Sequence, residues 1–372
     1  MKLLLLDQFS DPGGAQQVLL ELLPAFRDLG WTALAGMPGA GEMFERVRAL
    51  GFEAERIECG PFSSGEKSRA DLARFAKGTP RLLWQLRQMA ARVRPNLVYV
   101  NGPRLLPAVA LARLGAPVLF HSHSYLAPGF SRKMAGVSLR LVHAQVLASC
   151  RFVAEPWRNY VGDDRISVIY NGVAGPAETA ASPARQSPSA APAIGCIGRI
   201  APEKGQREFL EAAFTIHRAL PAARFFIYGA ALFSDAAGTR YDADVRAAAN
   251  GLPVEFRGWV NDAYAALAEL DLLLVPSAGH EATTRVILEA FAAGVPVIAF
   301  RSGGIPEVIQ EGVDGLLAGS VEEMARLAIG LMSGEPARLA ALTRAGRESW
   351  LRNFTLDRFR RQVVDAVERA AR

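Results

Sequence analysis

The 372-residue chain has few of the features that mark specialised protein classes. It has only three cysteines and no C-x-x-C pair, so we expect neither a disulfide framework nor a zinc site, and a reducing cytoplasm is the favoured location. No uninterrupted apolar run approaches the roughly 18 residues of a membrane-spanning helix, which argues against an integral membrane protein. The apolar run Leu3–Leu6 is too short for a signal peptide and is typical of a buried strand.

Charge of one sign is not in large excess either. The 42 basic and 37 acidic residues leave a net charge of +5, too little for a protein that coats nucleic acid. One basic stretch, Lys67 to Arg94, interleaves positive and apolar side chains, with Asp71 as its one acid. This pattern predicts either an amphipathic helix packed on a sheet or a peripheral contact with the inner face of the cytoplasmic membrane.

Short apolar runs alternate with longer segments of helical period along the chain, half of whose residues are hydrophobic. Helices are expected over residues 16–29, 206–220 and 285–293. Strands are expected at Leu3–Leu6, Leu97–Val100, Val118–Phe120, Val146–Ala148, Ile194–Ile197, Arg224–Tyr228, Leu272–Val275 and Val297–Phe300. This alternation predicts an α/β fold with parallel sheets covered on both faces.

A stretch with almost no large apolar residue separates two such halves. Residues 175–193 are mainly Ala, Pro, Ser and Gly, which predicts a linker. We therefore expect one doubly wound domain over residues 1–174 and a second over 194–354, with a helix in 355–372 that packs back on the first. Open α/β sheets bind ligands at the carboxyl ends of their strands, so a shared cleft is the expected binding place.

The densest group of candidate site residues lies between His280 and Ile309. Glu281 and Glu289 are eight residues apart, and a helix that begins near Thr283 or Thr284 would point its free N–H groups at a phosphate. Glu281 could then accept hydrogen bonds from sugar hydroxyls and Glu289 could hold a ribose diol, although Glu289 could also be an ordinary solvated residue. The glycines of Ser302-Gly303-Gly304 predict a tight turn where the backbone approaches another segment or a ligand.

Charged and glycine residues after two other strands fit the same kind of ligand. Arg199 and Lys204 would oppose the two negative charges of a diphosphate, with a surface charge pair as the alternative. Gly13 and Gly14 precede a helix, where backbone amides could approach the ligand.

Two histidines and a D-x-D motif raise the question of a metal. We expect His121 and His123 to point to opposite faces of their strand, one of them into the cleft, which disfavours a shared metal ion. Asp242 and Asp244 are expected in the first turn of a helix, where acidic residues suit the macrodipole, so they do not predict a metal site. Neither G-x-G-x-x-G nor a phosphate loop of the G-K-[ST] type occurs, so a dehydrogenase or an ATPase has little support.

Six segments, taken together and in this order, resemble the retaining glycosyltransferases of family 4. They are Asp11–Ala15 (DPGGA), Pro117–Ser124 (PVLFHSHS), Val168–Val173 (VIYNGV), Ile197–Gly205 (IGRIAPEKG), Phe256–Val260 (FRGWV) and the E-x7-E region from His280 to Ile309. The resemblance implies the GT-B fold, with two facing Rossmann-like domains and an interdomain cleft. Two departures are Ala282-Thr283-Thr284 where the family usually has Pro-Phe-Gly, and Gln16 where it commonly has glutamate.

The resemblance also implies an activity. A sugar would pass from a nucleotide-diphosphate sugar to a hydroxyl of a glycan, glycolipid or lipid-linked saccharide, with retention, no required metal and no cofactor. The implied catalytic residues are His123, Arg199, Lys204 and Glu281, and donor contacts would also come from Gly13, Gly14, Trp259, Thr283, Thr284 and Glu289. His123, placed by the alignment of Pro117, would donate a hydrogen bond to the sugar. A GT-B-fold sugar-nucleotide epimerase or hydrolase and a non-catalytic nucleotide-sugar-binding protein are the alternatives.

Overall fold

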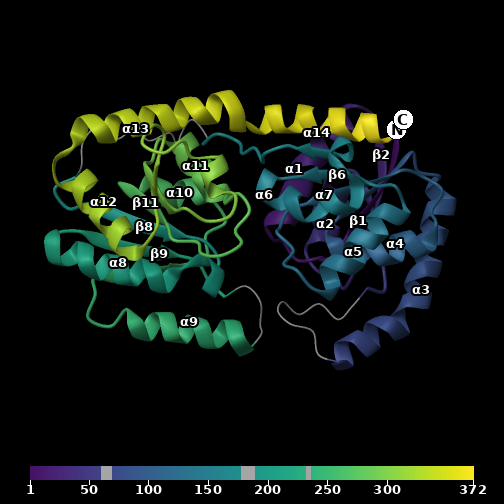
Figure 1. Ribbon diagram of the computed structural model, residues 1–372, viewed down its shortest axis with the longest axis horizontal. Coiled ribbons are helices and arrows are strands. Elements are labelled where there is room, and N and C mark those ends of the chain that lie inside the picture. The colour runs from purple at the N-terminus through teal and green to yellow at the C-terminus, as the bar shows by residue number, and fades with distance from the viewer. Residues whose placement is uncertain (60–68, 177–188, 232–235) are drawn as a thin grey trace. The chain divides into compact units, whose positions relative to one another are not determined.

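The computed structural model describes residues 1–59, 69–176, 189–231 and 236–372 (Figure 1). Contacts divide the chain into two compact units, which we call unit 1 (Met1–Asn171 with Arg358–Arg372) and unit 2 (Gly172–Asp357). Residues 177–188 of the expected linker lie outside the described residues. Each unit is built on a parallel sheet, so the predicted α/β fold with two Rossmann-like units is confirmed.

Unit 1 has a seven-stranded sheet in the order β3-β2-β1-β4-β5-β6-β7. Its elements are β1 (Lys2–Asp7), α1 (Gly14–Asp28), β2 (Thr32–Met37), α2 (Met43–Ala49), β3 (Glu53–Arg56), α3 (Arg69–Val93), β4 (Leu97–Asn101), α4 (Leu106–Ala112), β5 (Val118–Ser122), α5 (Phe130–Leu141), β6 (Gln145–Ala148), α6 (Arg151–Ala154), α7 (Arg158–Val161), β7 (Ile166–Val168) and, after unit 2, α14 (Leu356–Ala370). The central strands β1 and β4 are polar only at their ends, because helices cover both faces of the sheet.

The two faces of this sheet are covered by different helices. Side chains of α3, α4 and α5, among them Leu86, Val109 and Leu139, share a core with Val98 and Phe120 of the strands. Helix α14 packs elsewhere in unit 1, where Arg360 Nε donates to the backbone oxygen of Glu21 in α1 at 2.7 Å. Unit 1 therefore uses a helix that follows unit 2 in the chain.

Unit 2 has a six-stranded sheet in the order β10-β9-β8-β11-β12-β13. Its elements are β8 (Ala193–Ile197), α8 (Gln206–Ala219), β9 (Arg224–Tyr228), α9 (Ala236–Ala248), β10 (Val254–Gly258), α10 (Ala263–Ala268), β11 (Leu272–Val275), α11 (Arg285–Ala293), β12 (Val297–Phe300), β13 (Leu316–Ala318), α12 (Val321–Gly334) and α13 (Pro336–Ser349), followed by a π-helical turn at Trp350–Phe354.

One expectation about helix α9 was wrong. The helix begins at Ala236, so Asp242 and Asp244 lie beyond its first turn and not at its N-terminus. Asp242 instead accepts from Arg246 Nε, one turn further on, at 3.0 Å. The pair is a helix-surface ion pair of the i,i+4 kind.

Each sheet reverses its strand order once, between β1 and β4 in unit 1 and between β8 and β11 in unit 2. At such a point the connections leave toward opposite faces and open a crevice beyond the carboxyl ends of the strands. The loops that follow β1, β8 and β11 and the residues that end β4 therefore bound the two crevices.

Candidate functional site

The crevice of unit 2 brings together two residues that are 77 positions apart in the chain. Lys204, in the loop after β8, donates from Nζ to Glu281 Oε2, in the loop after β11, at 2.7 Å. The two side chains are 22% and 15% exposed, so the pair is largely buried. Its loops also touch at Gly205, where a Cβ would lie 2.0 Å from the backbone oxygen of Pro276. The predicted cation and carboxylate thus meet at the switch point.

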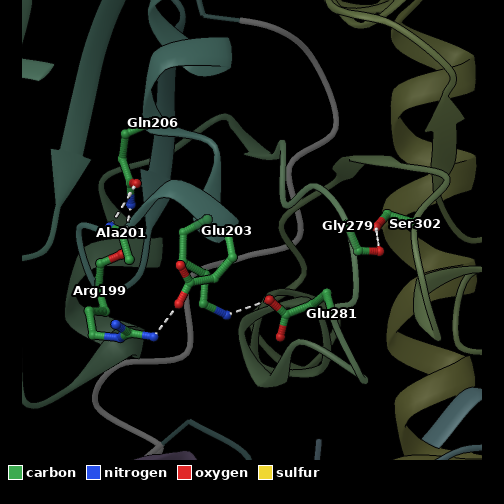
Figure 2. A network of polar contacts seen from close by, with 8 residues as sticks. Arg199, Ala201, Glu203, Gln206, Gly279, Glu281 and Ser302 are labelled. Carbon is green, nitrogen blue, oxygen red and sulfur yellow. Dashed lines mark hydrogen bonds and ion pairs between the residues drawn. The ribbon is translucent and has the colours of Figure 1, made fainter. Parts of the chain in front are cut away.

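Arg199 lies in the same loop as Lys204 and has a partner that the sequence analysis missed. Its guanidinium contacts Glu203 Oε1 at 2.5 Å, and Figure 2 shows the two side chains facing each other. The fully buried Gln206 braces the loop, because its amide donates to the backbone oxygen of Arg199 and accepts from the backbone N–H of Ala201. The i,i+4 spacing of Arg199 and Glu203 in the sequence could have indicated this ion pair.

The backbone of Glu281 is held by the turn after β12. Gly304 donates its N–H to the backbone oxygen of Glu281 at 3.0 Å. Ser302 Oγ donates to the backbone oxygen of Gly279 at 2.9 Å, as Figure 2 shows. Gly303 has φ +53°, and a Cβ there would lie 1.9 Å from the same oxygen of Glu281. The tight approach predicted for this turn is present, and it positions the Glu281 loop.

The N-terminus of α11 carries two buried hydroxyls. The helix begins at Arg285 with Thr284 as its N-cap, as the sequence predicts to within two residues. Thr283 and Thr284 are 5% and 7% exposed, and among the described residues neither Oγ1 has a hydrogen-bond partner. Buried hydroxyls are normally paired, so a ligand that accepts from both hydroxyls, and from backbone N–H groups at the start of the helix, would satisfy them.

Glu289 and Trp259 occupy different surroundings. Glu289 is mostly buried and lies 3.6 Å from Arg285 of the same helix, a partner that the i,i+4 spacing could have indicated. Trp259 follows β10, the edge strand, and is therefore separated from β8 by β9. It is 49% exposed and its indole donates to Asn261.

The crevice of unit 1 contains a buried polar network that the sequence analysis did not predict. Asp7, Asn101 and His121 are register partners at the ends of β1, β4 and β5. The Asp7 carboxylate accepts from Asn101 Nδ2 at 2.5 Å and from Gln16 Nε2 at 2.8 Å. Burial raises the pKa of Asp7 to about 6, against the opposing effect of these hydrogen bonds. Gln16 thus supplies a donor to Asp7, where the family's glutamate would bring a second carboxyl group.

This network sets the proton position on His123. Because Asn101 donates to the carboxylate, its Oδ1 faces His123 and accepts from Nε2 at 2.6 Å. Burial lowers the pKa of His123 to about 3, so the ring is neutral and Nδ1 carries a lone pair. Nδ1 is buried and has no partner among the described residues. With this proton position, Nδ1 can accept a hydrogen bond but cannot donate one, whereas the resemblance implies a donor.

The expectation that His121 and His123 point to opposite faces was wrong. Their ring centroids are 3.8 Å apart, because residues two apart in a strand share a face. His121 is fully buried, and its Nδ1 is hydrogen-bonded to the Tyr99 hydroxyl. Burial and the neighbouring His123 both lower the pKa of His121. His123 is the more exposed of the two.

Gly13 and Gly14 lie at the start of α1. Gly13 is the N-cap with an extended backbone, and Gly14 is the first residue of the helix. A Cβ at Gly14 would meet no heavy atom within 4 Å, so there is room beside Gly14, whereas a Cβ at Gly13 would lie 2.9 Å from Gln16 Oε1.

In the described ranges, no three His, Cys, Asp or Glu side chains group as a metal-ligand set. Metal independence therefore stays a prediction. No helix of the described part of the chain combines the length and hydropathy that a bilayer span requires.

Two family models match most of the chain. Residues 191–333 match the glycosyl transferases group 1, and residues 13–172 match the glycosyl transferase 4-like domain.

Curated relatives share only part of their length with this chain. A segment of 167 residues is 34% identical to a GDP-mannose-dependent monoacylated alpha-(1-6)-phosphatidylinositol monomannoside mannosyltransferase of Corynebacterium glutamicum and covers 42% of each chain. Another, of 166 residues, is 36% identical to 2-deoxystreptamine glucosyltransferase of Streptomyces kanamyceticus, over 43% of this chain and 41% of that one. These alignments span less than half of the relatives' length.

Solved structures match over nearly the whole length. HepE of Anabaena, solved in complex with UDP, has a TM-score of 0.82 at 24% identity and covers 99% of this chain and 100% of its own. Sucrose-phosphate synthase from Thermosynechococcus elongatus has a TM-score of 0.78 at 18% identity, with 99% of each chain covered. Together with the two parallel-sheet units described above, these matches show that the chain has the GT-B fold and belongs to the glycosyl transferases group 1.

Proposed function

We propose that this protein is a retaining glycosyltransferase of family 4 that moves a sugar from a nucleotide-diphosphate sugar to a hydroxyl of a carbohydrate or lipid-linked acceptor, without a required metal or cofactor. The observation that carries the proposal is the contact of Lys204 with Glu281 at the switch point of unit 2. Beside it lie the hydroxyls of Thr283 and Thr284, which have no hydrogen-bond partner in the part of the chain that the structure describes. Relatives named as mannosyl- and glucosyltransferases and HepE, solved with UDP and with UDP-glucose, support it.

The proposed diphosphate position follows from charge and hydrogen-bond supply. The N–H groups at the start of α11 and the hydroxyls of Thr283 and Thr284 would donate to phosphate oxygens. Lys204 would turn from Glu281 to the diphosphate, which frees the Glu281 carboxylate for sugar hydroxyls. Glu289 would accept hydrogen bonds from the ribose diol, and part of its contact with Arg285 would be lost.

Lys204 and Arg199 would act on the bond that breaks. The leaving diphosphate gains negative charge as the sugar departs, and fixed positive groups stabilise that charge more in the transition state than in the ground state. In the front-face mechanism implied by the resemblance, a donor phosphate oxygen helps to take the proton of the acceptor hydroxyl. In unit 1, His123 Nδ1 would accept from a hydroxyl of the transferred sugar, with the amides at Gly13 and Gly14 available to the donor.

Lys204 is the residue to test first, against Lys2, an exposed lysine at the start of β1, as a matched lysine. We expect Lys204→Gln to lower the transfer rate by at least about 100-fold, the range found when one electrostatic stabiliser of a transition state is removed. Lys2→Gln should transfer at the wild-type rate. The double variant Lys204→Gln/Glu281→Gln should regain any stability that the single variant loses, because no buried carboxylate is left unpaired, yet stay inactive. The assay screens UDP- and GDP-sugars by thermal shift and then follows transfer by product NMR.

Several outcomes would refute parts of this proposal. Donor epimerisation or hydrolysis in the absence of acceptor would favour the epimerase or hydrolase. Donor binding without transfer to any acceptor would indicate a binding protein. An inverted anomeric configuration would contradict retention, and loss of activity on chelation would contradict metal independence.

A further inference from the structure

A long part of unit 1 contains no acidic residue. Between Asp71 and Glu155 the chain has neither Asp nor Glu, although its net charge is only +5. The basic residues of this part are Arg74, Lys77, Arg81, Arg87, Arg92, Arg94, Arg104, Arg113, Arg132, Lys133, Arg140 and Arg151. Most of the part folds into helices α3, α4 and α5 with strands β4, β5 and β6 between them. Eight of these twelve residues lie in α3 or α5, so positive charge is concentrated on these two helices.

Helices α3, α4 and α5 form one layer side by side, as contacts between α3 and α4 and between α4 and α5 show (Figure 1). Their inner sides pack on the sheet through one common core. Their outer sides therefore face away from the sheet of unit 1. Of the basic stretch predicted from Lys67 to Arg94, Lys67 and the side chains of Arg69 and Arg74 lie outside the described residues.

The outer side of α5 carries an apolar stripe. Phe130, Met134 and Leu141 are 72%, 40% and 66% exposed, and Val137 between them is half-buried. The spacings of four, three and four residues place all four side chains on one side of the helix. This stripe lies opposite the inner side, where Ala135 and Leu139 are buried. A helix with apolar side chains on both sides is unusual at a free surface, where exposed apolar residues normally occur singly.

Basic side chains flank this stripe, and large apolar side chains are exposed on the two neighbouring helices. Lys133 and Arg140 are exposed on α5. Leu111 of α4 is 57% exposed and Trp84 of α3 is 60% exposed. The layer therefore presents apolar and cationic groups together on its outer side.

Three arginines also line an open pocket of about 380 Å³ at the C-terminal ends of α3 and α4. Arg87 donates to the backbone oxygens of Leu111 and Ala112, which fixes it at the rim. Arg94 and Arg113 form no ion pair among the described residues, unlike Arg92, which contacts Glu55. Their charges are available to an external anion.

We propose that the outer side of α3, α4 and α5 docks on an anionic lipid bilayer. The α5 stripe would enter the boundary between headgroups and acyl chains, and the basic residues would lie at the lipid phosphates. An apolar stripe of aliphatic and aromatic side chains suits a bilayer better than a nucleic acid, whose backbone needs only the charges. Since α5 begins seven residues after His123, docking would bring a membrane-anchored acceptor toward this edge of unit 1. Binding itself does not depend on the transfer reaction.

Co-sedimentation with lipid vesicles tests the proposal without any donor. The full chain should sediment with phosphatidylcholine vesicles that contain phosphatidylglycerol, less in high salt, and little with phosphatidylcholine alone. Phe130→Ser/Met134→Ser should reduce the partition coefficient at least about tenfold, and so should Lys133→Glu/Arg140→Glu. The matched controls are Phe214→Ser, an exposed phenylalanine of α8, and Arg218→Glu/Arg344→Glu, which has the same change in net charge. Both controls should bind as the wild type does.

Other outcomes would overturn the proposal. The proposal is wrong if the wild-type protein stays in the supernatant with anionic vesicles. It is also wrong if the α5 variants sediment as much as the controls do. Binding to a DNA duplex that equals vesicle binding and ignores the Phe130 and Met134 changes would indicate a nucleic-acid surface. A concentration-dependent dimer that dissociates in Phe130→Ser/Met134→Ser would indicate a second copy of this chain. Thermal midpoints of all variants identify any that fail to fold, and for those the single variants replace the double ones.

Discussion

At the scale of single residues, the network in unit 1 shows how one carboxylate sets a proton some distance away. Asp7 orients the amide of Asn101, and Asn101 in turn keeps the proton of His123 on Nε2. The free lone pair on Nδ1 is thus determined by a group that does not touch His123. Asp7 and Asn101 position the histidine and are not themselves expected to contact substrate.

The raised pKa of Asp7 makes a prediction about stability. Between pH 3.8 and about 6 the folded state keeps a proton that the unfolded state has lost. The protonated Asp7 therefore contributes its full stabilisation of the folded state below pH 3.8. This contribution is lost as the pH rises through about 6, which lowers the free energy of unfolding by up to about 3 kcal/mol. Asp7→Asn lacks this titration, so the free energy of unfolding of the wild type should fall relative to that of the variant across this range. Urea unfolding at a series of pH values measures it, and parallel curves would contradict it.

The sequence indicates which polar residues end these strands, but not that the residues meet in one network. The apolar runs LLLLD, LVYVN and VLFHS each end on polar residues, which was the available signal for Asp7, Asn101 and His121. Their meeting depends on the parallel register of strands whose sequence positions differ by up to 114, and no local pattern gives that. Lys204 and Glu281 were paired in the sequence analysis because a resemblance supplied their common ligand, and their direct contact was not foreseen.

At the scale of elements, the turn after β12 fixes the loop after β11. Gly303 is needed twice, for its positive φ and for the space that the backbone oxygen of Glu281 occupies. The two requirements can be separated because Gly312 has a similar φ, +74°, but nothing within 4 Å of an added Cβ.

Alanine at each of these glycines should therefore have different effects. Both variants accept a left-handed conformation that costs alanine about 1–2 kcal/mol. Gly303→Ala must also displace Glu281, so we expect a larger fall in the thermal midpoint and at least about a tenfold loss in affinity for the nucleotide sugar, equivalent to about 1.4 kcal/mol. Gly312→Ala should bind the donor as the wild type does. Equal donor affinities in the two variants, measured by calorimetric titration, would show that the turn does not support the site.

Long apolar and strongly periodic elements were predictable, and short ones were not. The helix over residues 285–293 was predicted with the bounds that α11 has. Strand β2, with the sequence TALAGM, gives a weak strand signal because alanine and glycine have little preference for strands. It forms because β1 and β3 pair with it on both sides. Tertiary pairing thus determines the elements whose own side chains favour a strand only weakly.

At the scale of the whole molecule, each unit has its own sheet and its own buried core. Two compact units can unfold separately, so a single two-state transition is not the default expectation. The proposed diphosphate contacts of Lys204, Arg199 and α11 all belong to unit 2.

Scanning calorimetry should therefore resolve two transitions. A nucleoside diphosphate at about 100 times its dissociation constant should stabilise the transition of unit 2 by about 2.7 kcal/mol and leave the other nearly unchanged. Asp7→Asn should move the transition of unit 1 and so assign it. One transition with equal calorimetric and van't Hoff enthalpies would show that the units unfold together.

Helix α14 has a consequence for synthesis on the ribosome. Residues 358–372 complete unit 1 but are translated after all of unit 2. The usual order, in which an N-terminal domain finishes folding while later parts are still being made, does not apply here. Nascent unit 1 therefore cannot complete its fold until all of unit 2 has emerged from the ribosome. Until then, the surface that Phe359, Val363 and Val367 cover in the folded protein stays open to chaperones.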